Sequence, residues 1–282
     1  MAPDAGYPGF LQSLTLQPVD YYSGPWCGHL PFGYDLVRDF QPQRIVELGA
    51  HRGQSYFGFC QAIRDGQLPA TAVAIDTWAG DPHAGFYGEA IFERFAAVND
   101  ERFHPFSTML RQTFDEALPT FVDDSIDLLH IDGLHTYDAV RHDFETWQSK
   151  LSRPALVLFH DTAVRERDFG VWKFWSEIRQ HYRAFEFVHS NGLGILFVGE
   201  PDQFRSANGL VRALLDPSQH AAIRALYESV AALFDRAHLF PSTLAERDRL
   251  LVQQREFKRE LRFCRRFSLA YSLRRLVRRP QL

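Results

Sequence analysis

The sequence predicts an α/β fold: a mostly parallel sheet of seven strands with intervening helices, completed by a terminal antiparallel hairpin. Between residues 44 and 199, short runs rich in β-branched and apolar residues alternate with amphipathic stretches of helical length. Strands that alternate with helices form βαβ units with parallel strands and right-handed crossovers. Two of the runs, VAI and LVLF, are continuously apolar, as expected of strands that are covered on both faces.

Five strands and four helices make up the alternating part. The predicted strands are 44–49, 71–76, 102–106, 125–132 and 155–161, and the predicted helices lie near 53–65, 88–99, 109–121 and 136–151. A further helix near 170–182 leads to two strands, 185–189 and 193–199, which Ser-Asn-Gly joins. Two β-rich runs joined in this way form an antiparallel hairpin, so the predicted sheet ends in one.

The segments on either side of this body are less regular. The N-terminal segment mixes aromatic residues with glycine and proline, which predicts an irregular arm or lid that ends in a short helix, PFGYDLVRDF. Helical stretches follow the sheet, and the last forty residues are rich in arginine. The predicted divisions are an arm or lid (1–43), the domain body (44–200), a helical extension (201–240) and a basic helical tail (241–282).

Composition and charge narrow the classes of protein. A chain of 282 residues with 45% hydrophobic content can bury a full core. The net charge is −4, yet residues 241–282 carry twelve Arg and Lys against four Asp and Glu, a net charge of +8 that leaves −12 on the first 240 residues. An acidic body argues against nucleic acid as a partner, because phosphate neutralisation needs a basic face.

The sequence also favours a cytoplasmic protein. Cys27, Cys60 and Cys264 are odd in number and far apart, which gives neither a disulfide framework nor a zinc pattern and fits a reducing compartment. The N-terminal residues lack the pattern of a secretory signal, and no window approaches the eighteen apolar residues of a membrane span.

A glycine-containing turn after the first predicted strand marks a nucleoside site. Glu47, Gly49 and Gly53 form an E-x-G-x-x-x-G run between strand and helix. Gly49 lets the backbone turn sharply, and Gly53 allows a ligand and the helix to approach closely. Asp76 ends the second strand, twenty-three residues after Gly53, where an acid can bind two ribose hydroxyls. The alternative for Asp76 is a helix cap or a turn residue.

S-adenosylmethionine (SAM) fits this turn better than NAD does. The G-x-G-x-x-G spacing of pyrophosphate binders is absent, and the carboxylate of Glu47 would repel a pyrophosphate but suits an ammonium and a sulfonium centre. Thr77, Trp78 and Ser107 are further candidates for contacts with SAM. Trp78 could equally pack in the core, and Ser107, which follows the third predicted strand, could cap the next helix.

Acidic residues and histidines follow the fourth and fifth predicted strands. These strands are neighbours in a doubly wound sheet, about 4.8 Å apart, so Asp132 and Asp161 converge, with His160 beside them. Two carboxylates and an imidazole form a hard site that suits Mg²⁺ or Mn²⁺ better than structural zinc. Within the apolar fourth strand, His130 is predicted to be a hydrogen-bonded core histidine, and His142 an exposed helix residue.

Several segments together resemble a known family. They are SGPWCGHLPFGYDLV, VELGAHRGQSYFGFCQA, AIDTWAGDPHAGFYGEAIF, SIDLLHIDGLHTYDAVRHDFETWQSKLS, VLFHDT and FGVWKFW, within about residues 23 to 199. The combination resembles a bacterial class I SAM-dependent methyltransferase family often encoded near glycosyltransferases. The resemblance implies a Rossmann-like fold in which five strands with crossovers precede the hairpin, and Asp132 is a candidate cofactor contact as well as a metal ligand.

More remotely, Asp132-x-x-His135 followed by His160-Asp161 is similar to the site of metal-dependent macrolide sugar O-methyltransferases. In those enzymes an aspartate after the fourth strand and an acidic pair after the fifth hold Mg²⁺, and the histidine is the general base. The resemblance assigns that role to His135, whose ordinary pKa is about 6.5. His160 stands where the first acid of the pair would be, which puts the metal's affinity and selectivity in doubt.

The function that the resemblance implies is O-methylation of a saccharide or a glycosylated small molecule. One alternative is a SAM- or metal-binding relative that transfers no methyl group, such as a hydroxylase-like protein or a glycosyltransferase partner. Another is an NAD-dependent oxidoreductase, which the missing glycine pattern disfavours. The basic, helical residues 245–279 predict either a solvated helix, which could pair in a homo-oligomer, or peripheral contact with the anionic inner membrane surface.

Overall fold

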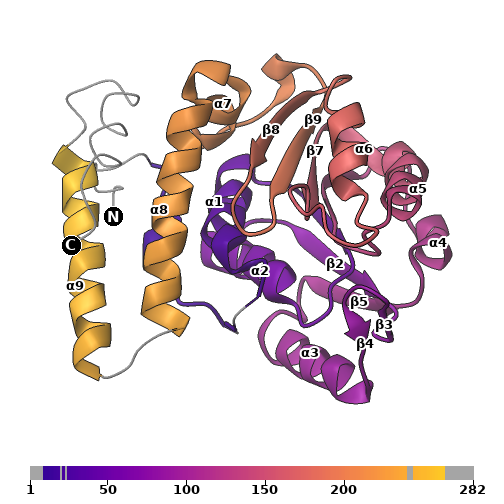
Figure 1. Ribbon diagram of the computed structural model, residues 1–282, viewed down its shortest axis with the longest axis horizontal. Helices are drawn as coiled ribbons and strands as arrows, with labels where there is room; N and C mark the ends of the chain where they lie inside the picture. Colours follow the sequence, from indigo (N-terminus) through magenta and orange to yellow (C-terminus); the bar gives the residue numbers. More distant parts are fainter. Residues whose placement is uncertain (1–8, 20, 23, 240–243, 264–282) are drawn as a thin grey trace.

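A seven-stranded sheet forms the centre of the computed structural model (Figure 1). Its strands are β1 (Arg44–Leu48), β2 (Thr71–Asp76), β5 (Ser107–Arg111), β6 (Ile126–Ile131), β7 (Leu151–His160), β8 (Arg183–Phe187) and β9 (Leu193–Val198). They lie in the order β5-β2-β1-β6-β7-β9-β8, and β9 alone runs in the opposite direction to the other six strands. This confirms the predicted Rossmann-like, mostly parallel sheet with a terminal hairpin. The structure describes residues 9–19, 21, 22, 24–239 and 244–263.

Helices cover both faces of the sheet. They are α1 (Leu30–Phe40), α2 (Gln54–Gly66), α3 (Glu89–Arg102), α4 (Phe114–Ala117), α5 (Tyr137–Trp147), α6 (Val171–Ile178), α7 (Leu210–Leu215), α8 (His220–Leu239) and α9 (Leu244–Phe263). Short 3-10 turns are η1 (Gln12–Thr15), η2 (Cys27–His29), η3 (Leu118–Thr120), η4 (Gln148–Lys150), η5 (Pro201–Gln203) and η6 (Pro217–Gln219). A separate two-stranded hairpin consists of β3 (Gly80–Asp81) and β4 (Gly85–Phe86).

Neighbouring residues of the buried strands point into two different cores. Leu128 belongs to the core that α1, α2, α7 and α8 share, whereas Leu129 belongs to the core beneath α4, α5 and α6 (Figure 1). In the same way, Leu158 and Phe159 lie in opposite cores. Successive side chains of a strand point to opposite faces, so a strand covered on both sides must be apolar throughout.

The third predicted strand was placed too early in the sequence. Residues 102–106 are not a strand: Arg102 is the last residue of α3, and the backbone N–H of Phe103 closes that helix on Asn99. The aromatic run RFHPF is apolar enough for a strand, but Pro105 has no N–H for a sheet ladder. The strand is β5, which begins at Ser107, and the following helix begins accordingly at Phe114 rather than near residue 109.

Segments from both ends of the described chain pack against α1. The buried carboxylate of Asp35 accepts hydrogen bonds from the backbone N–H and hydroxyl of Ser13, each 2.7 Å, and from the hydroxyl of Tyr227 in α8, 3.0 Å. One turn later, Asp39 accepts hydrogen bonds from the hydroxyl of Ser206 and the backbone N–H of Val211, each 2.7 Å. Residues before and after the sheet therefore complete the core that covers one of its faces.

The basic tail is described only in part. Helix α9 extends beside α8 to Phe263 (Figure 1), and the rest of the predicted helical segment, residues 264–279, lies outside the described residues. Among the helices that the structure describes, none is both long enough and apolar enough to cross a bilayer. Membrane contact through the tail stays a prediction.

Candidate functional site

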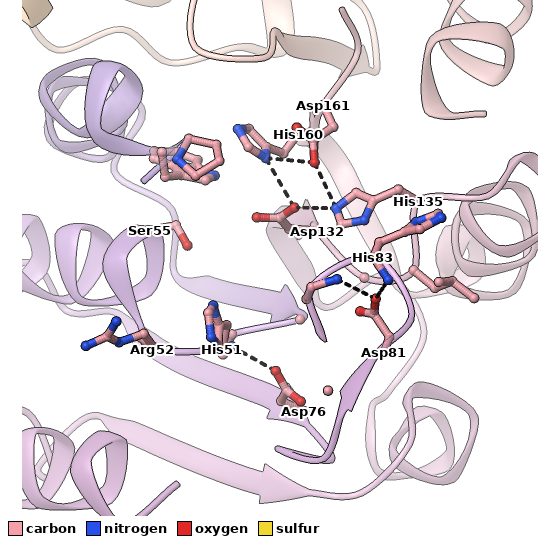
Figure 2. Close-up of a pocket in the computed structure, with 18 of the residues that line it drawn as sticks. His51, Arg52, Ser55, Asp76, Asp81, His83, Asp132, His135, His160 and Asp161 are labelled. Atoms are coloured by element: carbon pink, nitrogen blue, oxygen red, sulfur yellow. Dashed lines mark hydrogen bonds and ion pairs between the residues drawn. The ribbon is translucent and has the colours of Figure 1, made fainter. Parts of the chain in front are cut away.

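A cavity of about 620 Å³ opens at the carboxyl ends of the central strands. The strand order reverses between β1 and β6, and the cavity lies at this switch point, where open α/β sheets bind their ligands. Its walls include Gly49 after β1, Asp76 at the end of β2, Asp132 after β6 and Asp161 after β7. Figure 2 shows Asp132 and Asp161 together on one side of this pocket and Asp76 on the other. These four residues are among the seven predicted site residues that line the cavity; the others are Thr77, His135 and His160.

Position 49, in the turn after β1, must be glycine because this turn lies directly against the turn after β6. Gly49 has a φ of 92°, and a Cβ atom there would collide with the carbonyl oxygen of Asp132. Backbone hydrogen bonds fix both turns: the N–H of Gly49 donates to Ile75 and that of Asp132 to Leu48, each 2.9 Å. Gly53 also has a positive φ, but its missing side chain makes room for the ring of Phe57, and Gly53 does not line the cavity.

Asp76 faces the cavity from the end of β2, as predicted. Its Oδ2 accepts the backbone N–H of His51, 2.8 Å (Figure 2), and its Oδ1 accepts that of Trp78, 2.7 Å. Burial raises the pKa of this carboxyl, and the two backbone hydrogen bonds oppose the rise. Thr77 lines the cavity beside it. Asp76 therefore joins the β1 turn to the β2 turn and keeps further acceptor lone pairs for a ligand.

Besides Gly53, three predicted cofactor contacts lie outside the cavity lining. Ser107 is at the amino end of β5, where its side chain bonds to Tyr56 and Asn99, so it neither caps a helix nor reaches the cavity. Trp78 is 1% exposed among aromatic core residues and donates its indole N–H to the carbonyl of His51, 2.8 Å. The left-handed backbone of Trp78 turns this ring into the core, which was the alternative for it.

Glu47, the third of these predicted cofactor contacts, is fully buried beneath the turn after β1. Its Oε1 accepts the hydroxyl of Ser55, 2.6 Å, and its Oε2 lies 3.2 Å from Nδ1 of His130. His130 in turn accepts the indole N–H of Trp26, 3.2 Å, which confirms it as a hydrogen-bonded core histidine. Burial raises the pKa of Glu47, and the nearby His130 opposes the rise. Glu47 thus acts on the cavity through Ser55, which lines it.

Two aspartates and two histidines form a compact cluster on the other side of the cavity (Figure 2). Oδ1 of Asp132 lies 3.3 Å from Nε2 of His135 and 3.2 Å from Nδ1 of His160. Oδ2 of Asp161 lies 2.8 Å from the same atom of His135 and 3.5 Å from the same atom of His160. The convergence of Asp132 and Asp161 that the sequence predicted is confirmed.

The charges of the cluster set the pKa of each member. Burial alone would lower the pKa of His135, but its hydrogen bonds to Asp132 and Asp161 raise it to about 9. In the same way the two carboxylates outweigh burial at His160 and raise its pKa to about 10. The imidazoles in turn hold the pKa of both carboxyls well below its usual range. Without a cation, His135 is therefore an imidazolium at neutral pH, whereas its ordinary pKa would leave it mostly neutral.

The group best placed to hold a cation differs from the predicted one. Among the described residues, the ligand atoms of Asp132, His135 and Asp161 all lie within 4.8 Å of one another, and His160 is not part of this group. Oδ1 of Asp161 is buried without a hydrogen-bond partner, so this oxygen is available as a ligand for a cation. Two carboxylates and an imidazole suit a hard divalent cation. His160 instead faces Asp132 as a counter-ion.

The structure adds residues that the sequence reading missed. Tyr22, in the N-terminal arm, lines the cavity and stacks under the guanidinium of Arg52, 4.4 Å from its ring centre. His83 and Phe169 lie beside His135, from loops that follow β2 and β7. Periodicity and turn chemistry do not reveal such contacts, since they join irregular segments that are distant in sequence. His142, by contrast, is exposed on α5, as predicted.

The comparison with known families bears on the part of the chain that builds this cavity. Residues 46–162 match the family model of a methyltransferase domain. The match covers less than half of the chain but extends from β1 to the residues just after β7, and the matched segment includes Asp76, Asp132 and Asp161. The strand order agrees with a class I methyltransferase fold.

A curated relative and several solved structures are similar to the chain. Over 175 residues the chain is 52% identical to the uncharacterized protein y4gI of Sinorhizobium fredii. The aligned stretch is 62% of this chain but 19% of that protein, so the chain spans about a fifth of that relative. The O-methyltransferase TomG of Streptomyces achromogenes, involved in tomaymycin synthesis and solved with SAM, is 21% identical, with a TM-score of 0.46 over 64% of this chain and 82% of that one. An O-methyltransferase of Bacillus cereus, solved with SAH, is 14% identical, with a TM-score of 0.47 over 64% and 84%.

Proposed function

We propose that the chain is a SAM-dependent O-methyltransferase whose methyltransferase domain binds SAM and presents the Asp132, His135 and Asp161 group to an acceptor hydroxyl. The observation that carries this proposal is that Asp76 and this acid–imidazole group line one cavity, at the switch point of a methyltransferase domain. SAM already carries an activated methyl group. The protein's share of the reaction is therefore to position the two substrates and to remove one proton.

The cofactor side of the cavity consists of the turns after β1 and β2. Asp76 binds the ribose hydroxyls with the lone pairs that its two backbone donors leave free. The turn from Gly49 to Arg52 lines the adjoining wall and accommodates the methionine part of SAM. Glu47 supports this turn from below through Ser55 rather than by contact with the ligand.

His135 is the proposed general base. Its Nε2 points to the two carboxylates and takes the proton of the acceptor hydroxyl, while the methyl group moves in line from the sulfur of SAM to the acceptor oxygen. Asp132 and Asp161 orient the ring and stabilise the imidazolium that forms. The raised pKa of His135 makes it a poor base at neutral pH as long as both carboxylates are free to pair with it.

A divalent cation would remove this obstacle, and Asp132 and Asp161 are its proposed ligands. Mg²⁺ or Mn²⁺ lowers the pKa of a hydroxyl that it coordinates. With both carboxylates neutralised by a bound cation, the pKa of His135 would fall back toward its ordinary value, and the free imidazole would be available near pH 7. Nε2 of His135 cannot bind a cation and accept a proton at once, and we assign it the second role.

The proposed acceptor is a saccharide or a glycosylated small molecule. The cavity has room beside the cofactor turns, and its walls combine aromatic rings, such as Tyr87 and Phe114, with polar groups, such as Asn191. A sugar ring has apolar C–H faces that pack on aromatic rings and hydroxyls that need polar partners, so such a mixed wall suits it.

Calorimetry and a transfer assay test the proposal in sequence. The protein is titrated with SAM and, separately, with NAD; the expected result is binding of SAM alone. It is then incubated with methyl-labelled SAM, Mg²⁺ and a panel of glycosides and free sugars, with His135→Ala as the inactive control. Absence of SAM binding in the folded protein would overturn the proposal. SAM binding without transfer to any hydroxyl acceptor would favour a SAM-binding relative that transfers no methyl group.

A further inference from the structure

The hairpin that follows the cofactor turn reaches across to the catalytic imidazole. His83 lies in the tight loop between β3 and β4, where the carboxylate of Asp81 accepts the backbone N–H groups of His83, 2.6 Å, and Ala84, 2.8 Å. The loop is therefore held in one shape, and it directs the ring of His83 toward His135, with a distance of 5.6 Å between ring centres (Figure 2).

A second loop, after β7, meets this hairpin. Nε2 of His83 lies 2.6 Å from Oδ1 of Asp168, and the ring of His83 is stacked on that of Phe169, with centres 4.4 Å apart and planes 22° apart. The side chain of His83 is 3% exposed, whereas that of Asp168 is 72% exposed. An ion pair and a ring contact thus join segments that are 85 residues apart in sequence.

Phe169 also stacks on the catalytic imidazole itself. Its ring centre lies 4.8 Å from that of His135, and the two planes are nearly parallel, at 12°. The loop is fixed to the backbone of His135, because the N–H of Gly170 donates to the carbonyl of His135, 2.7 Å. A side chain at Gly170 would collide with the backbone of Tyr137, so the two segments touch directly.

We propose that His83 and Phe169 are positioning residues, which hold the imidazole of His135 at the angle that proton removal requires. The proposal rests on the proposed role of His135 as general base. Phe169 fixes the ring plane by stacking, and the ion pair of His83 with Asp168 keeps Phe169 in place. Since the hairpin begins a few residues after Asp76, this contact also joins the cofactor wall of the cavity to its catalytic wall.

Nuclear magnetic resonance of the histidine rings tests this contact without any acceptor. The full chain is labelled at histidine, and the ring protons of His135 are assigned by comparison with His135→Gln. Stacking on an aromatic ring shifts protons upfield, so Phe169→Leu should remove an upfield shift at His135. The matched control is Phe86→Leu. Phe86 lies in the β3–β4 hairpin that contains His83, and it is 80% exposed. This control should leave the His135 signals unchanged.

Kinetics then separate positioning from binding. Phe169→Leu should lower kcat by about 10- to 100-fold, the usual effect of a misplaced reacting group, and leave the Kd for SAM within twofold. Asp168→Asn, a mild change at an exposed site, should lower kcat by about two- to fivefold, as an exposed ion pair contributes little. Glu166→Gln in the same loop is its control and should have no effect.

Failure of this proposal is distinguishable from failure of the proposed function. If the His135 signals of folded Phe169→Leu match those of the wild type, or if Phe86→Leu changes them equally, the positioning role is wrong whatever the enzyme catalyses. If the shift is lost but kcat is unchanged, Phe169 touches the ring without positioning it for reaction, which also overturns the proposal. If the wild type transfers no methyl group but Phe169→Leu loses the shift, the contact between Phe169 and His135 is established and the proposed function is wrong.

Discussion

Substitution of Asp76 tests the cofactor site most directly, and the structure decides which substitution to use. Each oxygen of this carboxylate accepts one buried backbone N–H, from His51 and from Trp78. Asp76→Ala would leave both N–H groups unpaired, at about 1–3 kcal/mol each, and thus lower the free energy of unfolding by about 2–6 kcal/mol. Asp76→Asn keeps one acceptor oxygen and the shape of the side chain, and therefore loses about half as much.

The expected effect of Asp76→Asn on the affinity for SAM follows from the lost charge. A hydrogen bond to a charged group contributes about 1.5–3 kcal/mol, so replacing the carboxylate by an amide should raise the Kd for SAM by about 10- to 100-fold. Asp127→Asn is the matched control, since Asp127 also accepts two backbone N–H groups, from Gln43 and Arg44, but at the opposite end of the sheet.

Calorimetry with SAM measures the affinity, and urea unfolding measures the stability of the same samples. Asp127→Asn should bind SAM normally, whereas Asp76→Asn should lose both affinity and stability. If folded Asp76→Asn bound SAM as tightly as the wild type, Asp76 would not be a ribose ligand. Equal losses of affinity in both variants would mean that the effect comes from general destabilisation.

Three further perturbations test the catalytic wall and the limits of the fold. EDTA should stop turnover, and Mg²⁺ or Mn²⁺ should restore it with little change in SAM affinity; full activity in EDTA would refute the metal. His135→Ala should lower kcat by about 10²- to 10⁴-fold. The pKa of His135 is raised to about 9 without a cation, so its free base forms only as the pH rises through that value. Any metal-free rate should therefore increase toward pH 9, whereas the rate of the metal-loaded protein should increase at lower pH. A pH profile that His135→Ala leaves unchanged would contradict this. Truncation after Leu239, which removes α9 and the basic tail, should retain SAM binding and turnover on a soluble acceptor, whereas truncation before His220 should prevent folding because α8 fills the core.

The sequence predicted the central cavity well because parallel strands end at one edge. Asp76, Asp132 and Asp161 each follow an apolar strand, and the strand order alone brings their side chains together. The prediction for Ser107 failed because it depended on the length of α3, and helix ends are the least certain part of such an interpretation. Trp78 was ambiguous, since an aromatic ring after a strand fits a ligand or a core equally well.

Contacts between loops were beyond the reach of sequence patterns. His83 and Phe169 lie in irregular segments, and neither hydrophobic periodicity nor a short motif links them to His135. The raised pKa of His135 was equally hidden, because it depends on two carboxylates whose distances only the folded chain defines. The exchange of His160 for His135 in the candidate cation group has the same origin, since both rings lie near the two acids and only the folded chain defines which ligand atoms form one group.

The burial of Asp35 limits the order in which segments of the chain can fold. Its carboxylate is fully buried and bonded to Ser13 and Tyr227, so three segments must be present before it is satisfied. Tyr227 follows Asp35 by 192 residues, so this contact can form only after residue 227 has left the ribosome. Until then the carboxylate of Asp35 lacks its hydrogen bond from Tyr227 and stays hydrated, and the core on the α1 side of the sheet is incomplete. The core on this face of the sheet is therefore completed only after all seven strands of the sheet have been synthesised.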